Sequence, residues 1–351
     1  MDDESRREAY VLMRDKPLLA ISMLGFVAAC TTMTISGAPT VPVYAVAETE
    51  PVGTNNEDAA DDPAIWRNAE RPEDSLIVAT DKKGGLYVYG LDGRIRSFHS
   101  QPGLNNVDLA EIPSHGIVVF ASDRSDLANG RIALFRLLPT TGVLEPLASL
   151  PAGTGEAYGI CGYEREGSLI VYTAPKEGNI SEWKIGFSPA PDAKLLRSMQ
   201  VPSQPEGCAV DPRNGDLYIG EEAKGIWRFG KNETVGEIVA PVDNVHLVAD
   251  LEGLAIITEG QREGWLYASS QGDSTYMRYR LPAVTPAGRF RVAEGTYGRT
   301  EETDGIEAKR GDFGPMFPRG IFVAQDGQNG REAQNFKLVP LDAIEEVLSK
   351  P

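Results

Sequence analysis

Glu206-Gly-Cys-Ala-Val210 is one of six copies of a short pattern in which a polar residue, often followed by glycine, precedes a few apolar residues. The other copies are Asp62-Pro-Ala-Ile-Trp66, Asn106-Val-Asp-Leu109, Tyr158-Gly-Ile-Cys161, Glu252-Gly-Leu-Ala-Ile256 and Asp304-Gly-Ile-Glu307. Successive copies begin 44, 52, 48, 46 and 52 residues apart. A period in this range is typical of a protein built from stacked or circularly arranged repeats.

Each of the six units contains a second pattern, an apolar run that leads into a charged turn. These runs are Ser75–Lys83, Gly116–Arg124, Ser168–Glu177, Asp216–Glu222, Gly264–Asp273 and Gly320–Asp326. Most are followed by a further run rich in aromatic or β-branched residues, and alternating apolar and polar positions indicate half-buried antiparallel strands. Several short strands per unit predict an all-β fold, a six-bladed β-propeller with four-stranded antiparallel blades, over residues 45–342.

The segments that flank the repeats carry their own predictions. Residues 31–44 form a short linker, and Val41–Ala47 is predicted to be a spare strand that closes the ring by pairing with Asn335–Val339. Leu341–Ser349 has the pattern of a short helix, and residues 343–351 are the C-terminal tail. Because closure of this kind leaves no open sheet edge at the junction, we expect a monomer.

The first 30 residues are predicted to be an export signal. Arg14 and Lys16 precede the apolar stretch Leu18–Ala29, which is too short to span a bilayer comfortably. The stretch runs into Val27-Ala-Ala-Cys30, which resembles a bacterial lipobox and predicts a lipid on Cys30; a plain cleaved signal is the alternative. With either Met1 or Met13 as the start, the protein leaves the cytoplasm and is periplasmic, lipid-anchored to the outer membrane or extracellular.

Two further cysteines, Cys161 and Cys208, follow within the repeats. Export permits a disulfide, but the repeat alignment puts them one position out of phase. One position along a strand means the opposite face. We therefore predict that both are unpaired and behave as small buried apolar residues.

The formal net charge of the chain is -17, from 51 acidic and 34 basic residues. This excess argues against a nucleic acid partner, because a phosphate backbone requires a basic surface. An acidic excess also keeps an exported protein soluble. The positions of the carboxylates therefore carry more information than their number.

Charged residues recur at the strand ends that a propeller brings to one face around its axis. We expect the following residues to gather there: Asp61, Asp62, Glu206, Glu222, Asp250, Glu252 and Asp304, with Lys82, Lys83, Arg124, Lys176 and Tyr158. Crowded carboxylates repel one another, and calcium prefers oxygen ligands, so the cluster predicts bound cations. Ordinary solvated turns are the alternative, although Asn, Ser or Gly would serve as well in such turns.

Basic residues within an acidic ring indicate a ligand that is itself negatively charged. Arg124 can hold a phosphate through two hydrogen bonds, whereas Lys82 and Lys176 act as point charges. The three histidines lie in no histidine-phosphatase motif, and the sequence has no Cys-x5-Arg loop, Gly-x-Ser-x-Gly elbow or Walker loop. Direct attack by a metal-activated water is the mechanism that remains.

At these residues the sequence resembles the β-propeller phytases. Motifs similar to those of that family occur in order from about residue 45 to residue 342: Glu48–Val52, Asp58–Trp66, Thr80–Leu86, Leu104–Asp108, Glu206-Gly207, Asp250–Gly253, Ala268–Gly272, Thr303–Gly305, Phe322–Gly327 and Gln334–Lys337. The resemblance implies a propeller with several calcium ions. It also implies hydrolysis of phosphomonoesters of myo-inositol hexakisphosphate (phytate), bound as its calcium complex in two neighbouring phosphate pockets.

The same resemblance implies roles for individual residues. Those that fall where the family contacts phosphate are Lys82, Arg124, Tyr158 and Lys176. Those that fall where it holds active-site calcium are Asp61, Glu206, Glu222, Glu252 and Asp304, with Glu48 and Asp250 nearby. Those that match structural calcium sites are Asp62, the carbonyl of Val107, Asp326 and Asn329. Gly298 stands where the family often has an aspartate ligand, which implies that a peripheral calcium site is weak or absent.

Two other functions are compatible with a propeller. A calcium-dependent lactonase of the other six-bladed propellers would need one deeply buried metal with few carboxylates, and would not need Arg124 and two lysines around it. A lipid-anchored propeller used only for binding would show ligand affinity without turnover, because a fold alone does not give function.

Overall fold

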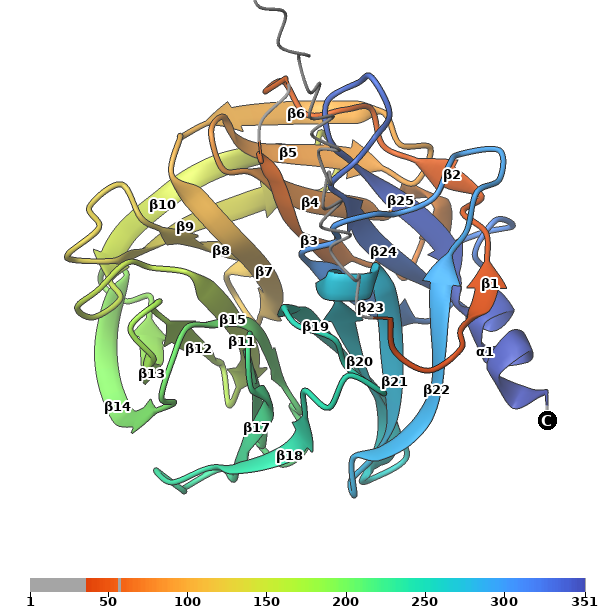
Figure 1. The fold of residues 1–351 in the computed structure, drawn as a ribbon. Helices are drawn as coiled ribbons and strands as arrows, with labels where there is room; N and C mark the ends of the chain where they lie inside the picture. Colours follow the sequence, from red (N-terminus) through yellow and green to blue (C-terminus); the bar gives the residue numbers. More distant parts are fainter. Residues whose placement is uncertain (1–35, 56–57, 351) are drawn as a thin grey trace, which may run out of the picture. The chain divides into compact units, whose positions relative to one another are not determined.

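Six sheets make up the computed structural model, which describes residues 36–55 and 58–350. The sheets stand around a common axis (Figure 1). The four consecutive strands of blades 1 to 5 are antiparallel, as are the strands of blade 6. The predicted six-bladed propeller is therefore confirmed. The predicted export signal and Cys30 lie outside the described residues.

The first three blades each consist of four consecutive strands. Blade 1 comprises β3 (Ala60–Trp66), β4 (Leu76–Asp81), β5 (Gly85–Gly90) and β6 (Ile95–Ser100). Blade 2 comprises β7 (Leu104–Ile112), β8 (Gly116–Asp123), β9 (Arg131–Leu138) and β10 (Val143–Pro151). Blade 3 comprises β11 (Gly159–Arg165), β12 (Ser168–Ala174), β13 (Asn179–Gly186) and β14 (Asp192–Gln200).

Blade 4 likewise consists of four consecutive strands, whereas blades 5 and 6 each include an N-terminal strand. Blade 4 comprises β15 (Pro205–Val210), β16 (Leu217–Glu221), β17 (Gly225–Phe229) and β18 (Glu237–Pro241). Blade 5 comprises β19 (Leu251–Glu259), β20 (Glu263–Ser270), β21 (Thr275–Leu281), β22 (Thr285–Val292) and β1 (Val41–Val43). Blade 6 comprises β23 (Ile306–Arg310), β24 (Gly320–Asp326), β25 (Asn335–Pro340) and β2 (Ala47–Glu48).

The N-terminal segment closes the ring, but it divides between two blades. Ala47 and Glu48 pair antiparallel with Leu338 and Lys337, so β2 supplies the outer strand of blade 6 as predicted. Val41–Val43 instead pairs in parallel with Phe290–Val292 of blade 5. One predicted strand is thus two short strands, and the N-terminal segment joins the last two blades.

Helical structure is short in the described residues. The predicted C-terminal helix is α1 (Leu341–Ser349), and its residues Leu341 and Ile344 are buried against blades 5 and 6. Two 3-10 turns, η1 (Pro72–Asp74) and η2 (Gln271–Asp273), lie in loops. None of the helices in the described part of the chain has the length and apolar character needed to cross a bilayer.

Apolar contacts between neighbouring blades form the core of the propeller. In β4, Ile77 and Ala79 pack against blade 6, whereas the alternating residues Leu76 and Val78 pack against blade 2. Both faces of this strand are therefore buried, which explains its continuous apolar sequence. The same division gives one apolar cluster at each of the six interfaces between blades.

Glycine follows the polar residue in four of the repeats because the inner strands crowd together at the axis. A Cβ atom on Gly159 would lie 2.1 Å from the Glu206 carbonyl oxygen, and one on Gly207 would lie 2.2 Å from the Glu252 carbonyl oxygen. A side chain at either position would collide with the backbone of the next blade. The repeated glycine is therefore explained by the close approach of neighbouring inner strands. This approach also brings the polar residues of those strands together.

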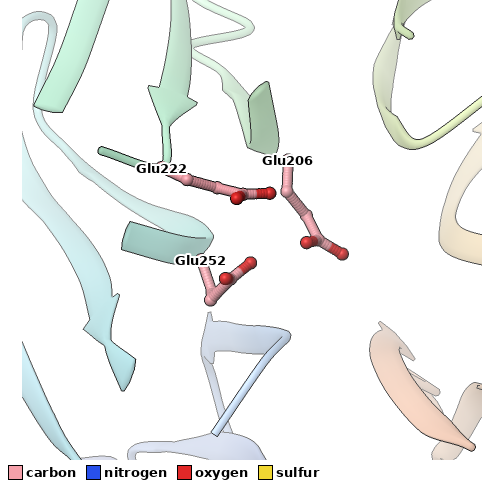
Figure 2. A group of neighbouring side chains, drawn as sticks. All are labelled: Glu206, Glu222 and Glu252. Carbon is pink, nitrogen blue, oxygen red and sulfur yellow. The ribbon is translucent and has the colours of Figure 1, made fainter. Parts of the chain in front are cut away.

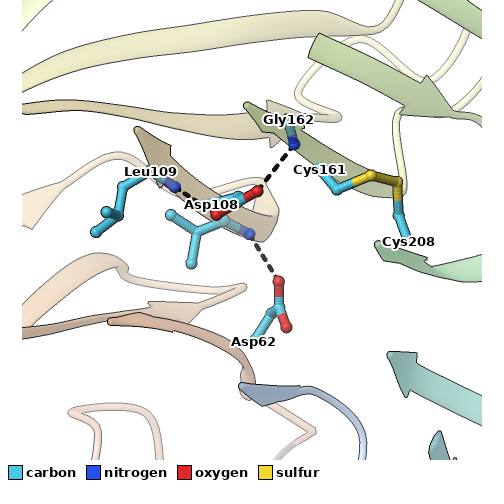
Figure 3. Close-up of a disulfide and its surroundings, with 7 residues drawn as sticks. Asp62, Asp108, Leu109, Cys161, Gly162 and Cys208 are labelled. Atoms are coloured by element: carbon cyan, nitrogen blue, oxygen red, sulfur yellow. Dashed lines mark hydrogen bonds between the residues drawn. A yellow bond between two sulfur atoms is a disulfide. The ribbon is translucent and has the colours of Figure 1, made fainter. Parts of the chain in front are cut away.

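The prediction that Cys161 and Cys208 are unpaired is wrong. They form a disulfide between β11 and β15, the inner strands of blades 3 and 4, with their Cα atoms 5.4 Å apart (Figure 3). The two residues do lie on opposite faces of their own blades, as their phase requires. Blades stack face to face, however, so Cys161 faces blade 4 and Cys208 faces blade 3. Opposite phase is therefore what brings the two sulfur atoms together.

We expect loss of this disulfide to lower the free energy of unfolding. The bond closes a loop with a sequence separation of 47 residues, for which loop-closure entropy predicts about 4 kcal/mol. Urea unfolding of the wild type and of Cys161→Ala/Cys208→Ala measures the difference. A reducing agent should destabilise the wild type and leave the double variant unchanged. Equal unfolding midpoints for the two proteins without reducing agent would contradict the role of the disulfide.

Candidate active site

The predicted site residues lie at the ends of the two inner strands of each blade. Asp61, Glu206 and Glu252 lie at the start of first strands, in β3, β15 and β19. Lys82 and Glu222 directly follow the second strands β4 and β16. Because first and second strands are antiparallel, the start of one and the end of the other lie at the same end of the blade. Strand geometry therefore collects these side chains around the axis.

A cavity of about 540 Å³ lies at this end of the axis. Its lining includes seven of the predicted residues: Lys82, Tyr158, Glu206, Glu222, Asp250, Glu252 and Asp304. It also includes Asp58, Gln204, Gln271, Glu302 and Gln334, which sequence reasoning did not assign to the site. Asp58 could have been predicted from the sequence, because it is the first residue of the motif that contains Asp61.

Three glutamates form the acidic centre of this cavity. Glu206, Glu222 and Glu252 come from blades 4 and 5, and each offers a carboxylate oxygen within 4.8 Å of the others (Figure 2). Burial, followed by the charge of Glu252, raises the pKa of Glu206 well above its ordinary value. Burial likewise raises the pKa of Glu252 to about 8. Without a bound cation, ionisation of all three glutamates is therefore unfavourable.

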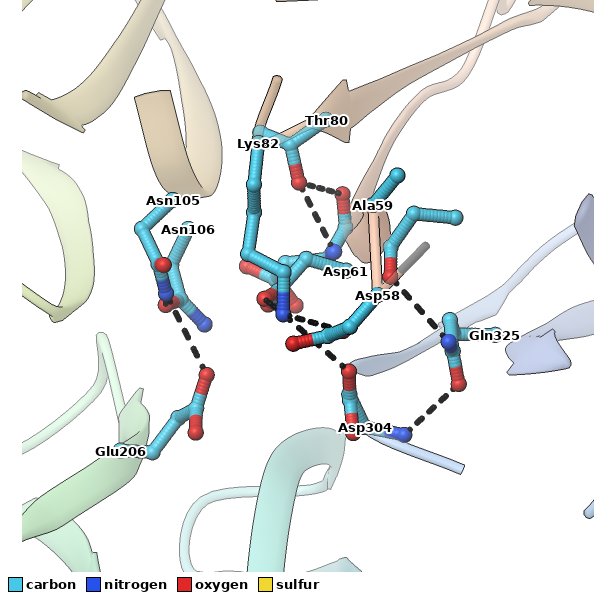
Figure 4. Close-up of polar contacts among 12 residues, drawn as sticks. Asp58, Ala59, Asp61, Thr80, Lys82, Asn105, Asn106, Glu206, Asp304 and Gln325 are labelled. Carbon is cyan, nitrogen blue, oxygen red and sulfur yellow. Dashed lines mark hydrogen bonds and ion pairs between the residues drawn. The ribbon is translucent and has the colours of Figure 1, made fainter. Parts of the chain in front are cut away.

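Lys82 of blade 1 is a cation in the same cavity, and it contacts three aspartates. Its Nζ lies 2.8 Å from Asp61 Oδ2, 2.8 Å from Asp58 Oδ1 and 3.6 Å from Asp304 Oδ2 (Figure 4). Burial alone would lower the pKa of Lys82, but the negative charges of Asp61 and Asp304 outweigh it and raise the pKa above its ordinary value. Lys82 therefore carries a fixed positive charge in the cavity.

Neighbouring side chains hold the carboxylate of Glu206 and the backbone of Asp304. The Asn105 amide donates a hydrogen bond to Glu206 Oε1 at 3.3 Å. Gln325 in β24 accepts a hydrogen bond from the Asp304 backbone N–H at 2.8 Å and donates one to the Ala60 carbonyl at 3.1 Å (Figure 4). The acidic groups are consequently held in place rather than free to turn toward solvent.

The donor set fits a hard cation such as calcium. Asp61 is fully buried, and its two carboxylate oxygens accept no hydrogen bond of regular geometry, although Lys82 lies close to one of them. Glu252 Oε2 is also buried without a hydrogen-bond donor. Buried carboxylate oxygens require a positive partner, and calcium takes oxygen ligands of this kind. Lys82 alone does not balance the carboxylates around it.

Arg124 and Lys176 lie at the rim of the site, beside Tyr158. The guanidinium carbon of Arg124 is 5.7 Å from the centre of the Tyr158 ring, and Lys176 Nζ is 4.3 Å from it. Burial, followed by the charge of Glu206, raises the pKa of Tyr158, so its hydroxyl stays protonated. Tyr158 therefore links the acidic cavity to a pair of cations on blades 2 and 3.

The structure places the remaining predicted calcium residues in two other locations. Asp62 accepts a hydrogen bond from the Val107 backbone N–H at 3.0 Å (Figure 3). With Asp108 and Glu307, it lines a second cavity, which is bounded by the first strands of the six blades. Glu48 does not line the axial cavity. It lies instead with Asp326 and Asn329 around the ammonium group of Lys337, which contacts all three side chains.

The fold and the site together define a class of protein, a six-bladed propeller with an acidic axial cavity and a cationic rim suited to a phosphorylated ligand. The phytase family model matches residues 16–351, and the chain belongs to the phytase family. The chain is also 35% identical over 329 residues to a 3-phytase of Bacillus subtilis, covering 88% of this chain and 86% of that protein.

Two weaker similarities concern proteins of other names. A pre-rRNA-processing protein of Schizosaccharomyces pombe is 23% identical over 205 residues, which cover 54% of this chain and 44% of that protein. The PQQ-bound aldose sugar dehydrogenase of Streptomyces coelicolor superposes with a TM-score of 0.53 at 14% identity, over 86% of this chain and 99% of that one. At that identity the likeness concerns the fold alone.

The raised carboxylate pKa values predict how stability depends on pH when divalent cations are removed. The pKa of Glu252 rises from 4.5 to about 8 on folding, so the folded state holds a proton that the unfolded state loses in this interval. The free energy of unfolding of the chelated protein should therefore fall as pH rises from about 4.5 to about 8. Thermal unfolding across this range measures it.

Added calcium should restore stability mainly at the alkaline end of that range, because it favours the ionised carboxylates. Glu252→Gln removes one titrating group and should flatten the pH dependence of the chelated protein. Stability that stays constant or rises with pH in the chelated wild type would contradict the assigned electrostatics.

Proposed function

We propose that this chain is a calcium-dependent phytase, a phosphoric monoester hydrolase that releases phosphate from myo-inositol hexakisphosphate. The observation that carries the proposal is the position of Tyr158, which joins the acidic cavity to the Arg124–Lys176 pair in a member of the phytase family. The 3-phytase of Bacillus subtilis supports the same reaction class.

The axial carboxylates would hold the cations, and the rim would bind phosphate. The proposed active-site calcium ligands are Asp61, Glu206, Glu222, Asp250, Glu252 and Asp304. Calcium, when bound, supplies positive charge beside the transferring phosphoryl group and activates water for attack on phosphorus. Asp62 with the Val107 carbonyl, and Asp326 with Asn329, are proposed as structural calcium ligands.

The protein's own cations and hydroxyl groups would position the phosphate. Lys82 carries a fixed positive charge within the cavity, where it offsets the charge on the transferring group. Arg124 presents a planar fork of donors, and Lys176 presents a compact charge. Tyr158, which stays protonated, can donate its hydroxyl hydrogen to a phosphate oxygen. Phosphoryl transfer requires mainly such positioning and neutralisation of charge.

The residues that line the axial cavity support attack on phosphorus by water rather than by a side chain. Among the residues that the structure describes, those lining the axial cavity include no histidine, serine or cysteine, which are common nucleophiles of covalent enzymes. The two cysteines of the propeller are joined to each other. We therefore propose a single displacement on phosphorus without a covalent intermediate.

We further propose that the protein is exported and acts outside the cytoplasm as a monomer. The support is the composition of residues 1–30, with Arg14 and Lys16 ahead of an apolar stretch, and the disulfide, which is stable in oxidising compartments. A lipid on Cys30 would tether the propeller to a membrane. Globomycin treatment of expressing cells, which blocks lipoprotein signal cleavage, tests the tether.

Phosphate release from phytate is the first test of the proposed reaction. The purified chain lacking residues 1–30 should release phosphate in calcium and stop in excess chelator, with activity restored when calcium is added back. A folded protein that releases no phosphate at any calcium concentration would contradict the phytase assignment. Binding without release would favour a non-catalytic propeller, and hydrolysis of lactones would favour a lactonase.

Substitutions in the cavity should separate catalysis from folding. Lys82→Ala and Glu206→Gln each remove charge needed in the cavity, and we expect kcat/KM for phytate to fall by about a hundredfold or more. Lys184→Ala, on the exposed side of β13, and Glu145→Gln, on the outer strand β10, are matched controls that should retain wild-type values. Near-normal turnover in both cavity variants, with unchanged circular dichroism, would overturn the assignment.

A further inference from the structure

Glu156 contacts both rim cations and has no role in the site described so far. Its Oε1 lies 3.1 Å from an Arg124 guanidinium nitrogen and 3.3 Å from Lys176 Nζ. The Arg124 contact is a hydrogen bond donated by the guanidinium. Arg124 and Glu156 side chains are each 21% exposed, and Lys176 is 30% exposed. One carboxylate oxygen thus bridges two partly buried cations.

The backbone around Glu156 is fixed by the same loops that carry the cations. The Lys176 backbone N–H donates to the Glu156 carbonyl at 3.1 Å. The Glu156 backbone N–H donates in turn to the Glu177 carboxylate at 3.1 Å. Reciprocal contacts between the loop before β11 and the loop after β12 therefore set the position of Glu156. Its bridging carboxylate is part of the local fold rather than a chance surface contact.

The bridging carboxylate lowers the charge that the rim offers to a phosphate. Arg124 and Lys176 together carry two positive charges, and Glu156 cancels one of them within hydrogen-bond distance. It also accepts a guanidinium N–H that would otherwise be free for a phosphate oxygen. A phosphate that contacts both cations must approach a fixed negative charge, and unit charges at such distances interact strongly where water is partly excluded.

We propose that Glu156 is a positioning residue that limits the affinity of the Arg124–Lys176 pair for phosphate. It holds the two cations side by side over Tyr158 and keeps their net charge low, so that inorganic phosphate dissociates after each reaction. Tighter binding of substrate and product alike would lower KM without raising kcat. The inference rests on the proposed function, in that Arg124 and Lys176 are the residues that bind phosphate.

Replacement of Glu156 by glutamine tests the charge while keeping the shape. Calorimetric titration of inorganic phosphate into the purified protein, at a fixed calcium concentration below that of calcium phosphate precipitation, gives the dissociation constant. We expect Glu156→Gln to bind phosphate about tenfold more tightly than the wild type. Glu145→Gln, which removes the same charge beside Arg136 on another part of the surface, should not change the constant.

Two further variants keep the test independent of folding and of geometry. Glu156→Asp retains the charge and should bind phosphate with near wild-type affinity, whereas Glu156→Ala removes the charge and should shift the constant in the same direction as Glu156→Gln. Higher salt should reduce the difference between Glu156→Gln and the wild type. Phosphate binding that is unchanged or weaker in both neutral variants, with unaltered thermal midpoints, would overturn the proposal.

Steady-state kinetics with phytate distinguish failure of this inference from failure of the proposed function. In an active wild type, Glu156→Gln should lower both KM and the inhibition constant of inorganic phosphate by about tenfold, without an increase in kcat. A loss of kcat with unchanged KM would contradict a role in limiting affinity. If the wild type releases no phosphate from phytate, the proposed reaction fails, while the calorimetric comparison still decides the role of Glu156.

Discussion

Mutual repulsion among the axial carboxylates is the constraint on which the site depends. Carboxylate oxygens of Glu206, Glu222 and Glu252 lie within 4.8 Å of one another. Among the described residues that line this cavity, Lys82 is the one with a positively charged side chain. Burial and neighbouring negative charge raise the carboxylate pKa values. Amides of the same size would remove this repulsion, so the presence of acids at these positions supports the proposed cation site. In that proposal the cavity binds cations at the expense of local stability.

The apolar interfaces between blades supply the rigidity that holds these charges together. Strands such as β4 bury both faces, one against each neighbouring blade, so a strand cannot move without disturbing two interfaces. Closure adds to this effect, because β2 completes blade 6 and β1 extends blade 5. The disulfide links the inner strands that lead to Tyr158 and Glu206. Repulsion at the axis is thus opposed by packing distributed around the whole ring.

The repeats were enough to predict the blades and the cluster at their strand ends, because both follow from the period and from strand direction. The disulfide could not be predicted from one blade, since Cys161 and Cys208 meet only when the stacking of two blades is considered. The position of Glu48 depended on how the N-terminal segment divides between blades 5 and 6. Glu156 follows no repeated pattern, and only its contacts with Arg124 and Lys176 reveal it.

The fold sets where chemistry can occur but not which chemistry it is. A sugar dehydrogenase shares the propeller at 14% identity, so the blades alone do not select a phosphate ester. In the proposed function this selection is made by residues just outside the strands, since Arg124, Lys176 and Lys82 follow the second strands of blades 2, 3 and 1. These three side chains lie outside the apolar clusters between the blades, although Lys82 and Arg124 form ion pairs with residues of neighbouring blades. A protein of net charge -17 can therefore present a local cationic rim to an anion, provided that cations neutralise the carboxylates beneath it.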